Sequence, residues 1–278
     1  MQDLRDIHDE AFAAEVDKLV EHAEESRLTR SKQFDFRKRN SFGINLVVIT
    51  GASSWFLWLL LSPDGDLRLA FISLVAMVFI PLLLHQWTMT PFKKYQHEFK
   101  SQLMPRMAKL LGNLKYSPSG GISMKAIMAS RVVPAHAEYT GEDAFLGKYK
   151  GTKIMVSEAR MKGNKKEPVF DGVFVLLITP KGKFKGHTII TSDDKMIKQY
   201  SKSRWKHMQE VPFAPGIDKK LYHIYSDTPD EAKSLADEDM MELLHRLNHL
   251  FDDTQITAVF FKDNRVFLQI PYDGDMFE

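Results

Sequence analysis

The sequence predicts an α+β protein in which a two-helix transmembrane hairpin with cytoplasmic helical extensions precedes a C-terminal domain of antiparallel sheet plus helices. Residues 42–61 contain no charged side chain, and residues 69–89 repeat this pattern after a short link. From about residue 124, alternating apolar and polar side chains replace helical spacing, which is typical of strands. The predicted segments are a cytoplasmic amphipathic helix and basic flank (1–41), the hairpin (42–89), a cytoplasmic helix (90–115) and a cytoplasmic α+β domain (116–278).

The composition of the 278-residue chain excludes several kinds of site. The chain has no cysteine, which excludes disulfides, thiol catalysis and zinc sites built on cysteine. Its formal net charge of +2 gives no indication of a general polyelectrolyte role. The charge is nevertheless uneven, because residues 145–206 carry fifteen basic and five acidic side chains (net +10), whereas residues 207–278 carry six basic and fifteen acidic ones (net -9).

The two apolar segments have the length of membrane spans. A spanning helix needs about 20 apolar residues, and residues 42–61 and 69–89 supply twenty and twenty-one. A buried helix of a soluble protein rarely stays apolar around its whole circumference for this length. The link "SPDGDLR" is rich in turn-forming residues, so the two spans are expected to form an antiparallel hairpin.

The charges beside the spans predict the orientation of the hairpin. Arg37, Lys38 and Arg39 precede the first span, and Lys93 and Lys94 follow the second. The positive-inside rule therefore places both termini in the cytoplasm. No Asp, Glu, Lys or Arg lies inside either span, which argues against a transporter or pump.

Helices are expected on both cytoplasmic sides of the hairpin. Residues 4–25 have apolar side chains at helical spacing, and so do residues 92–114, where Pro105 predicts a bend. We expect these two helices to pack on each other within one chain, while a homo-oligomeric coiled coil is the alternative. The segment "YSPSGGIS" is interpreted as the linker into the C-terminal domain.

The C-terminal domain contains alternating strand patterns and one clear helix start. "TKIMVSEARM", "VFDGVFVLLIT" and "GHTIITS" are predicted as strands, with a hairpin turn at Pro180–Lys185 between the last two. Thr228 followed by Pro229 and early acids predicts a helix that begins there. "TAVFFKDNRVFLQIPY" is predicted as two strands joined by a turn at Asp263–Asn264.

Several of these blocks resemble an uncharacterised bacterial family. The blocks are "GEDAFLGKYKGTKIMVSEARM", "VFDGVFVLLITPKGKFKGHTIIT", "YHIYSDTPDEAKSLADEDMMELLHRL" and "ITAVFFKDNRVFLQIPYDGDMFE", together with "FRKRN" and "LGNLKYSPSGGI" beside the spans. Members of that family have two membrane spans and one C-terminal cytoplasmic domain of unknown function, and are often encoded near LemA-type membrane proteins. The resemblance therefore implies location in the bacterial inner membrane and a LemA-type partner, but no reaction.

The main candidate site is a lysine-rich surface for lipid or protein partners. Its residues are Lys148, Lys150, Lys153, Lys181, Lys183 and Lys185, and Lys162, Lys165 and Lys166 would join them if the two predicted hairpins are neighbours. A surface lysine beside anionic lipid contributes about 1 kcal/mol of attraction. The alternative is that these lysines only keep the turns soluble.

Sites of other kinds have weaker support. His245 and His249 have the spacing of two metal ligands, but Arg246 stands where a zinc protease has glutamate, so no metal site and no cofactor are predicted. No catalytic residue is assigned, although convergence of His136, Asp143 and Glu158 would favour a membrane-tethered enzyme. Nucleic acid is not expected. The predicted function is a membrane-anchored scaffold that binds protein partners or anionic lipid.

Overall fold

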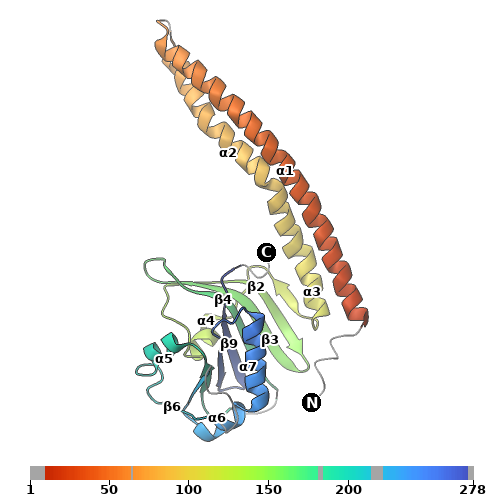
Figure 1. Ribbon diagram of the computed structural model, residues 1–278, viewed down its shortest axis with the longest axis vertical. Helices are drawn as coiled ribbons and strands as arrows, with labels where there is room; N and C mark the ends of the chain where they lie inside the picture. Colours follow the sequence, from red (N-terminus) through yellow and green to blue (C-terminus); the bar gives the residue numbers. More distant parts are fainter. Residues whose placement is uncertain (1–9, 64, 181–183, 214–221, 275–278) are drawn as a thin grey trace. The chain divides into compact units, whose positions relative to one another are not determined.

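The computed structural model describes residues 10–63, 65–180, 184–213 and 222–274. The chain divides into two compact units, Met1–Met107 and Ala108–Glu278. The first contains two long helices, and the second contains a broad antiparallel sheet with short helices (Figure 1). The α+β class and the two long apolar helices predicted from the sequence are confirmed.

The first unit is an antiparallel pair of helices, α1 (Glu10–Leu61) and α2 (Leu67–Glu98). Side chains of α1 that are at least half-buried recur every three or four residues, as expected for one helix packed along another. They begin with Val16, Leu19, Ala23, Ser26, Arg30, Phe34 and Arg37. The turn between the helices requires Gly65, because a Cβ there would lie 1.8 Å from the carbonyl oxygen of Leu59.

Both helices are long and apolar enough to cross a membrane. In their most apolar 18-residue windows only 6% and 11% of the residues are buried, so the apolar side chains point outward. Leu46, Val47, Phe71 and Leu83 are among the exposed ones. Exposure of so much apolar surface is unfavourable in water and favourable in lipid.

The helices are longer and more continuous than predicted. The expected cytoplasmic helix and the first span form one 52-residue helix, α1, because nothing in the basic stretch between them interrupts helical hydrogen bonding. After α2, the π-helical turn η2 (Phe99–Leu103) precedes α3 (Met104–Leu110). Pro105 has no N–H and its ring would clash with the carbonyl four residues earlier, which a widened turn relieves.

The second unit is built on one nine-stranded antiparallel sheet. Its strands are β1 (Lys115–Ser117), β2 (Glu138–Tyr149), β3 (Thr152–Lys162), β4 (Pro168–Ile178), β5 (Thr188–Thr191), β6 (Gln209–Glu210), β7 (His223–Ser226), β8 (Thr257–Phe261) and β9 (Arg265–Pro271). The order across the sheet is β1-β2-β3-β4-β9-β8-β5-β7-β6. The predicted linker thus contributes an edge strand, β1.

Helices cover both faces of this sheet. Ile127 of α4 (Met124–Ala129) and Met196 of α5 (Asp194–Tyr200) belong to one apolar cluster. Ala232 of α6 (Pro229–Leu235) and Leu244 of α7 (Glu238–Leu250) belong to the other. Neighbouring residues of each central strand alternate between the two clusters, as the pleat requires.

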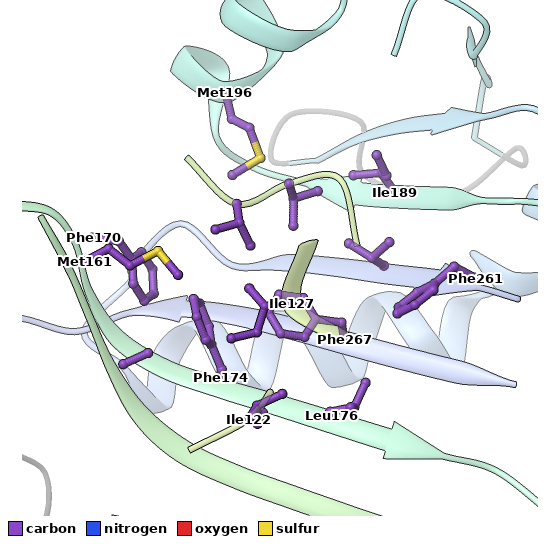
Figure 2. Packing of buried hydrophobic residues seen from close by; sticks show 14 of the residues in the cluster. Ile122, Ile127, Met161, Phe170, Phe174, Leu176, Ile189, Met196, Phe261 and Phe267 are labelled. Carbon is purple, nitrogen blue, oxygen red and sulfur yellow. The ribbon is translucent and has the colours of Figure 1, made fainter. Parts of the chain in front are cut away.

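The first cluster contains large aromatic side chains from the middle of the sheet. Phe174 of β4 lies between Phe170 and Phe267, with ring centroids 4.7 Å and 5.0 Å away (Figure 2). Ile127 and Met196 cover them from the helical layer. This packing keeps the sheet rigid and holds the turns at its ends in place.

Two predicted connections differ from the structure. The prediction that a hairpin turn at Pro180–Lys185 joins two neighbouring strands is wrong, because β9 and β8 lie between β4 and β5 in the sheet. The helix predicted from Thr228 begins at Pro229 as expected but divides into α6 and α7, since the side chain of Asp237 caps a new helix by accepting the N–H of Met240. The turn at Asp263–Asn264 is confirmed, and both residues have the positive φ that a tight hairpin needs.

Candidate binding surface at one end of the sheet

Three of the predicted lysines lie at the turn between β2 and β3. Lys148 stands directly opposite Lys153 in the ladder, and Lys150 lies in the turn with a positive φ of 46°. All three side chains are exposed. Like charges that face each other across a ladder destabilise it slightly, so this pair concentrates positive charge at a structural cost.

The fourth described lysine of the predicted set lies before β5. Lys185 is exposed, and its backbone N–H donates to the carboxylate of Glu231 at 2.9 Å. Lys181 and Lys183 lie outside the described residues. The chain after β4 passes close to the β2–β3 turn, because a Cβ added to Gly151 would lie 3.7 Å from Cγ of Pro180.

The register of the sheet places these lysines at the same sheet end. Lys153 pairs with Ile178, Ile178 with Arg265, and Arg265 with Phe261, while β5 begins at Thr188 beside β8. Four strand-to-strand steps separate β3 from β5, which corresponds to about 19 Å. The basic sheet end, as we define it, consists of five exposed lysines: Lys148, Lys150, Lys153, Lys185 and Lys262.

The carboxylates at this end are engaged by neighbouring donors. Asp227 accepts the backbone N–H of His187 at 2.7 Å. Glu231 accepts the N–H groups that precede β5. Asp263 lies 3.2 Å from the guanidinium of Arg265. Backbone N–H donors leave Asp227 and Glu231 charged, and of these three acids only Asp263 is paired with a cation in the part of the chain that the structure describes. The five lysines nevertheless outnumber these carboxylates, so positive charge exceeds negative charge among these residues.

A hollow of about 380 Å³ opens between the start of β5 and the β8–β9 turn. Its lining includes Arg131, Lys185, His187, Lys262 and Arg265. It therefore combines four permanently cationic side chains with two carboxylates, those of Asp227 and Asp263, and Asp263 is paired with Arg265. The surplus of positive charge in this concave setting favours an anionic group.

The imidazole of His187 forms part of the wall and is only 7% exposed. Its Nε2 lies 2.9 Å from the carbonyl oxygen of Ser130, so Nε2–H is the donor, and the ring stacks on Phe261 at 5.6 Å. Burial lowers the pKa of His187 from 6.5 to about 4. The imidazole is therefore neutral at pH 7 and acts as a structural hydrogen-bond donor.

Other residues singled out from the sequence lie elsewhere. Lys162, Lys165 and Lys166 are at the opposite end of β3, so they do not join Lys148, Lys150 and Lys153. The Nε2 atoms of His245 and His249 are 3.0 Å apart on the exposed side of α7. Among the described residues, no group of three or more metal-ligating side chains gathers.

The three residues considered for catalysis make contacts with other side chains and with the backbone. Nδ1 of His136 bonds to the carbonyl oxygen of Pro134 at 2.9 Å. Asp143 accepts the hydroxyl of Tyr116, and Glu158 lies 3.9 Å from the guanidinium of Arg160.

The sequence did not indicate Arg131, Lys262 or Arg265 as site residues. Lys262 and Arg265 join the site because β9 and β8 are inserted between β4 and β5, and Arg131 joins it from the segment after α4. The one sequence signal was the "KDNR" turn itself, which places two basic side chains beside a hairpin tip. The sequence alone does not show that this hairpin tip and the lysines of the β2–β3 turn lie at the same end of the sheet, because that depends on the strand order.

The fold and this surface define an α+β domain preceded by two helices of membrane-spanning length. Residues 168–278, which begin with β4, match the family described as "Protein of unknown function (DUF3137)". This match supports the resemblance to an uncharacterised family. It covers Lys185, Lys262 and most of the hollow's lining, but neither the part of the lining that includes Arg131 nor the β2–β3 turn. Comparison with the curated proteins and with the solved structures gives no match.

Proposed function

We propose that this chain is a bacterial inner-membrane scaffold, anchored by α1 and α2 with both termini in the cytoplasm, whose C-terminal unit binds anionic lipid surfaces through the basic sheet end. One observation carries the proposal. Five exposed lysines occupy one end of the sheet and outnumber the carboxylates of Asp227, Glu231 and Asp263, the last of which is paired with Arg265. The resemblance to a two-span bacterial family supports the location.

The strength expected from this surface is sufficient for reversible docking. Each surface lysine near anionic lipid contributes about 1 kcal/mol, so five of them together contribute roughly 5 kcal/mol at most. The attraction acts within a Debye length of about 8 Å at physiological salt, so the sheet end must lie almost on the lipid. A membrane anchor raises the effective concentration of the domain at the bilayer, so a modest affinity is enough.

Hydrogen exchange of the full-length protein in nanodiscs tests this proposal. We compare discs that contain anionic phosphatidylglycerol with discs of neutral phosphatidylcholine. Amides of residues 148–153 should exchange several-fold more slowly in the anionic discs, because docking covers the β2–β3 turn. The amides of residues 162–166, in the turn at the other end of β3, should not respond.

Charge reversal provides the matched comparison. Lys148→Glu with Lys153→Glu should abolish the protection, whereas Lys162→Glu with Lys165→Glu should preserve it. Equal protection of both turns, or protection that survives the first pair of substitutions, would contradict the proposal. Protection that arises only in native membranes would instead indicate a protein partner, such as the LemA-type protein that the resemblance implies.

A further inference from the structure

A groove runs along the helical hairpin beside the C-terminal part of α2, where basic residues are frequent. We call it the juxtamembrane groove; it has a volume of about 700 Å³ and is lined by Arg30, Leu83, Gln86, Trp87, Thr90, Lys93, Lys94, His97 and Glu98. From Leu83 to Glu98 these positions extend over about 22 Å of helix. All of them belong to the first unit of the chain.

The groove is apolar at one end and cationic at the other. Leu83 is 62% exposed and belongs to the predicted second span. Trp87 follows one turn later, and Lys93 and Lys94 come after a further one to two turns. A phospholipid has the same division, because its acyl chains need an apolar wall and its phosphate needs a cation. Lys93 lies about 15 Å along the helix from Leu83, which separates the cationic end of the groove from its apolar end.

Lys93 and Lys94 supply the net charge of this groove. Arg30 is paired with Glu98 at 2.5 Å, so these two side chains neutralise each other. In the part of the chain that the structure describes, neither Lys93 nor Lys94 forms an ion pair, and both are exposed. Two adjacent ammonium groups without a carboxylate partner favour an anionic ligand.

The wall between the apolar and cationic ends is held in place by α1. The guanidinium of Arg37 lies 4.9 Å from the centre of the Trp87 ring. Its Nη1 also donates to the backbone carbonyl oxygen of Trp87 at 2.9 Å. The indole is therefore positioned before any ligand arrives, which lowers the entropic cost of binding.

We propose that the juxtamembrane groove binds one anionic phospholipid, with an acyl chain against Leu83 and Trp87 and the phosphate between Lys93 and Lys94. This inference rests on the proposed membrane insertion of α1 and α2. It concerns a defined lipid on the hairpin and is separate from docking of the basic sheet end. Basic pockets between spanning helices on the cytoplasmic side are a recurrent site for anionic headgroups.

Native mass spectrometry of the full-length protein tests the proposed site. The protein is released from nanodiscs of phosphatidylglycerol and phosphatidylethanolamine, and the lipids that remain bound are counted. We expect the wild-type protein to retain phosphatidylglycerol preferentially. Lys93→Gln with Lys94→Gln should lower this preference roughly 30-fold, because each lysine near anionic lipid contributes about fivefold.

The control variant removes two charges from the same juxtamembrane region but outside the groove. Lys32→Gln with Lys38→Gln should retain the wild-type preference, because neither residue lines the groove. Lys93→Arg with Lys94→Arg, which keeps both charges, should also retain the preference for phosphatidylglycerol. An equal loss in both glutamine variants, or no preference in the wild-type protein, would overturn the inference.

Alkaline carbonate extraction of membranes separates this result from the proposed anchor. A chain that stays in the membrane pellet but shows no lipid preference refutes only the groove. A chain released into the soluble fraction refutes membrane insertion, and with it the basis of the lipid site. Competition by soluble glycerol phosphate would show recognition of the phosphate alone and would overturn the role of the apolar wall.

Discussion

Acidification from pH 7 to pH 4 should destabilise the C-terminal unit through the imidazole of His187. This side chain is 7% exposed, donates Nε2–H to the carbonyl oxygen of Ser130 and stacks on Phe261. Burial lowers its pKa from 6.5 to about 4. Protonation would place a charge in a poorly solvated site and would give the ring a second N–H donor.

The sign and size of the effect follow from the two pKa values of His187. Between pH 6.5 and pH 4 the unfolded chain binds a proton that the folded chain does not, so the free energy of unfolding falls as the pH falls. The stabilisation is fully present above the unfolded pKa of 6.5 and is lost as the pH falls to the folded value of about 4. The difference between these two pKa values corresponds to a loss of about 3 kcal/mol in the free energy of unfolding.

Urea unfolding of the full-length protein in detergent measures this loss. Trp205 is 1% exposed and its indole donates to the carbonyl oxygen of Arg131, so its fluorescence reports the C-terminal unit. The other three tryptophans are replaced by phenylalanine. We compare His187 with His187→Gln, which does not titrate. Carboxylates contribute equally to both proteins, so the difference in their pH dependence isolates the imidazole.

The expected result is that the His187 protein loses about 3 kcal/mol more than His187→Gln between pH 7 and pH 4. The glutamine variant should be less stable at pH 7, because it loses the ring contact with Phe261, and this loss should not depend on pH. Identical pH dependence of the two proteins would refute the reasoning.

Three further substitutions test the fold, each by urea unfolding followed through Trp205. Phe174→Ala should lower the free energy of unfolding by about 3–5 kcal/mol, because the ring is fully buried and leaves a cavity; a loss below 1 kcal/mol would contradict the packing. Gly172→Ala should cost more than about 1 kcal/mol, since its Cβ would lie 2.2 Å from the carbonyl oxygen of Ile270 at a φ of 152°. Asp193→Ala should cost about 1 kcal/mol by removing two capping hydrogen bonds of α5, and Asp193→Asn should recover most of it.

The sequence predicts those parts of the fold that depend on local pattern. Residues 42–61 and 69–89 indicate two apolar helices because each segment is apolar around its circumference. The continuity of α1 through the basic stretch before the first span was not predicted, because a change in polarity does not interrupt helical hydrogen bonds. Local composition therefore indicates which part of a helix is apolar better than it indicates the residues at which the helix begins and ends.

Strand pairing was predicted less well. "PKGKFK" has the composition of a tight turn, yet β4 and β5 are not neighbours. β8 and β9, some eighty residues later in the chain, occupy the space between them, as the pairing of Ile178 with Arg265 shows. Such non-local pairing depends on the whole sheet and leaves no signal in the turn.

The candidate surface was predicted in part for the same reason. Lys148, Lys150 and Lys153 are recognisable from one hairpin, since its strands and turn are local. Lys262 and the buried His187 join the site only through the strand order. Their contribution could not be derived from spacing along the chain.

The measurement that tests the account most directly is the depth of the basic sheet end at a lipid surface. The chain has no cysteine, so Thr152→Cys at the β2–β3 turn and Asn164→Cys at the other end of β3 each give one labelling site. A fluorophore on each is exposed to nitroxide-labelled lipid in nanodiscs that carry the full-length protein. We predict strong quenching at residue 152 in phosphatidylglycerol discs, little at residue 164, and loss of the difference at high salt. Equal quenching at both positions, or quenching at residue 152 that does not depend on anionic lipid, would contradict the account.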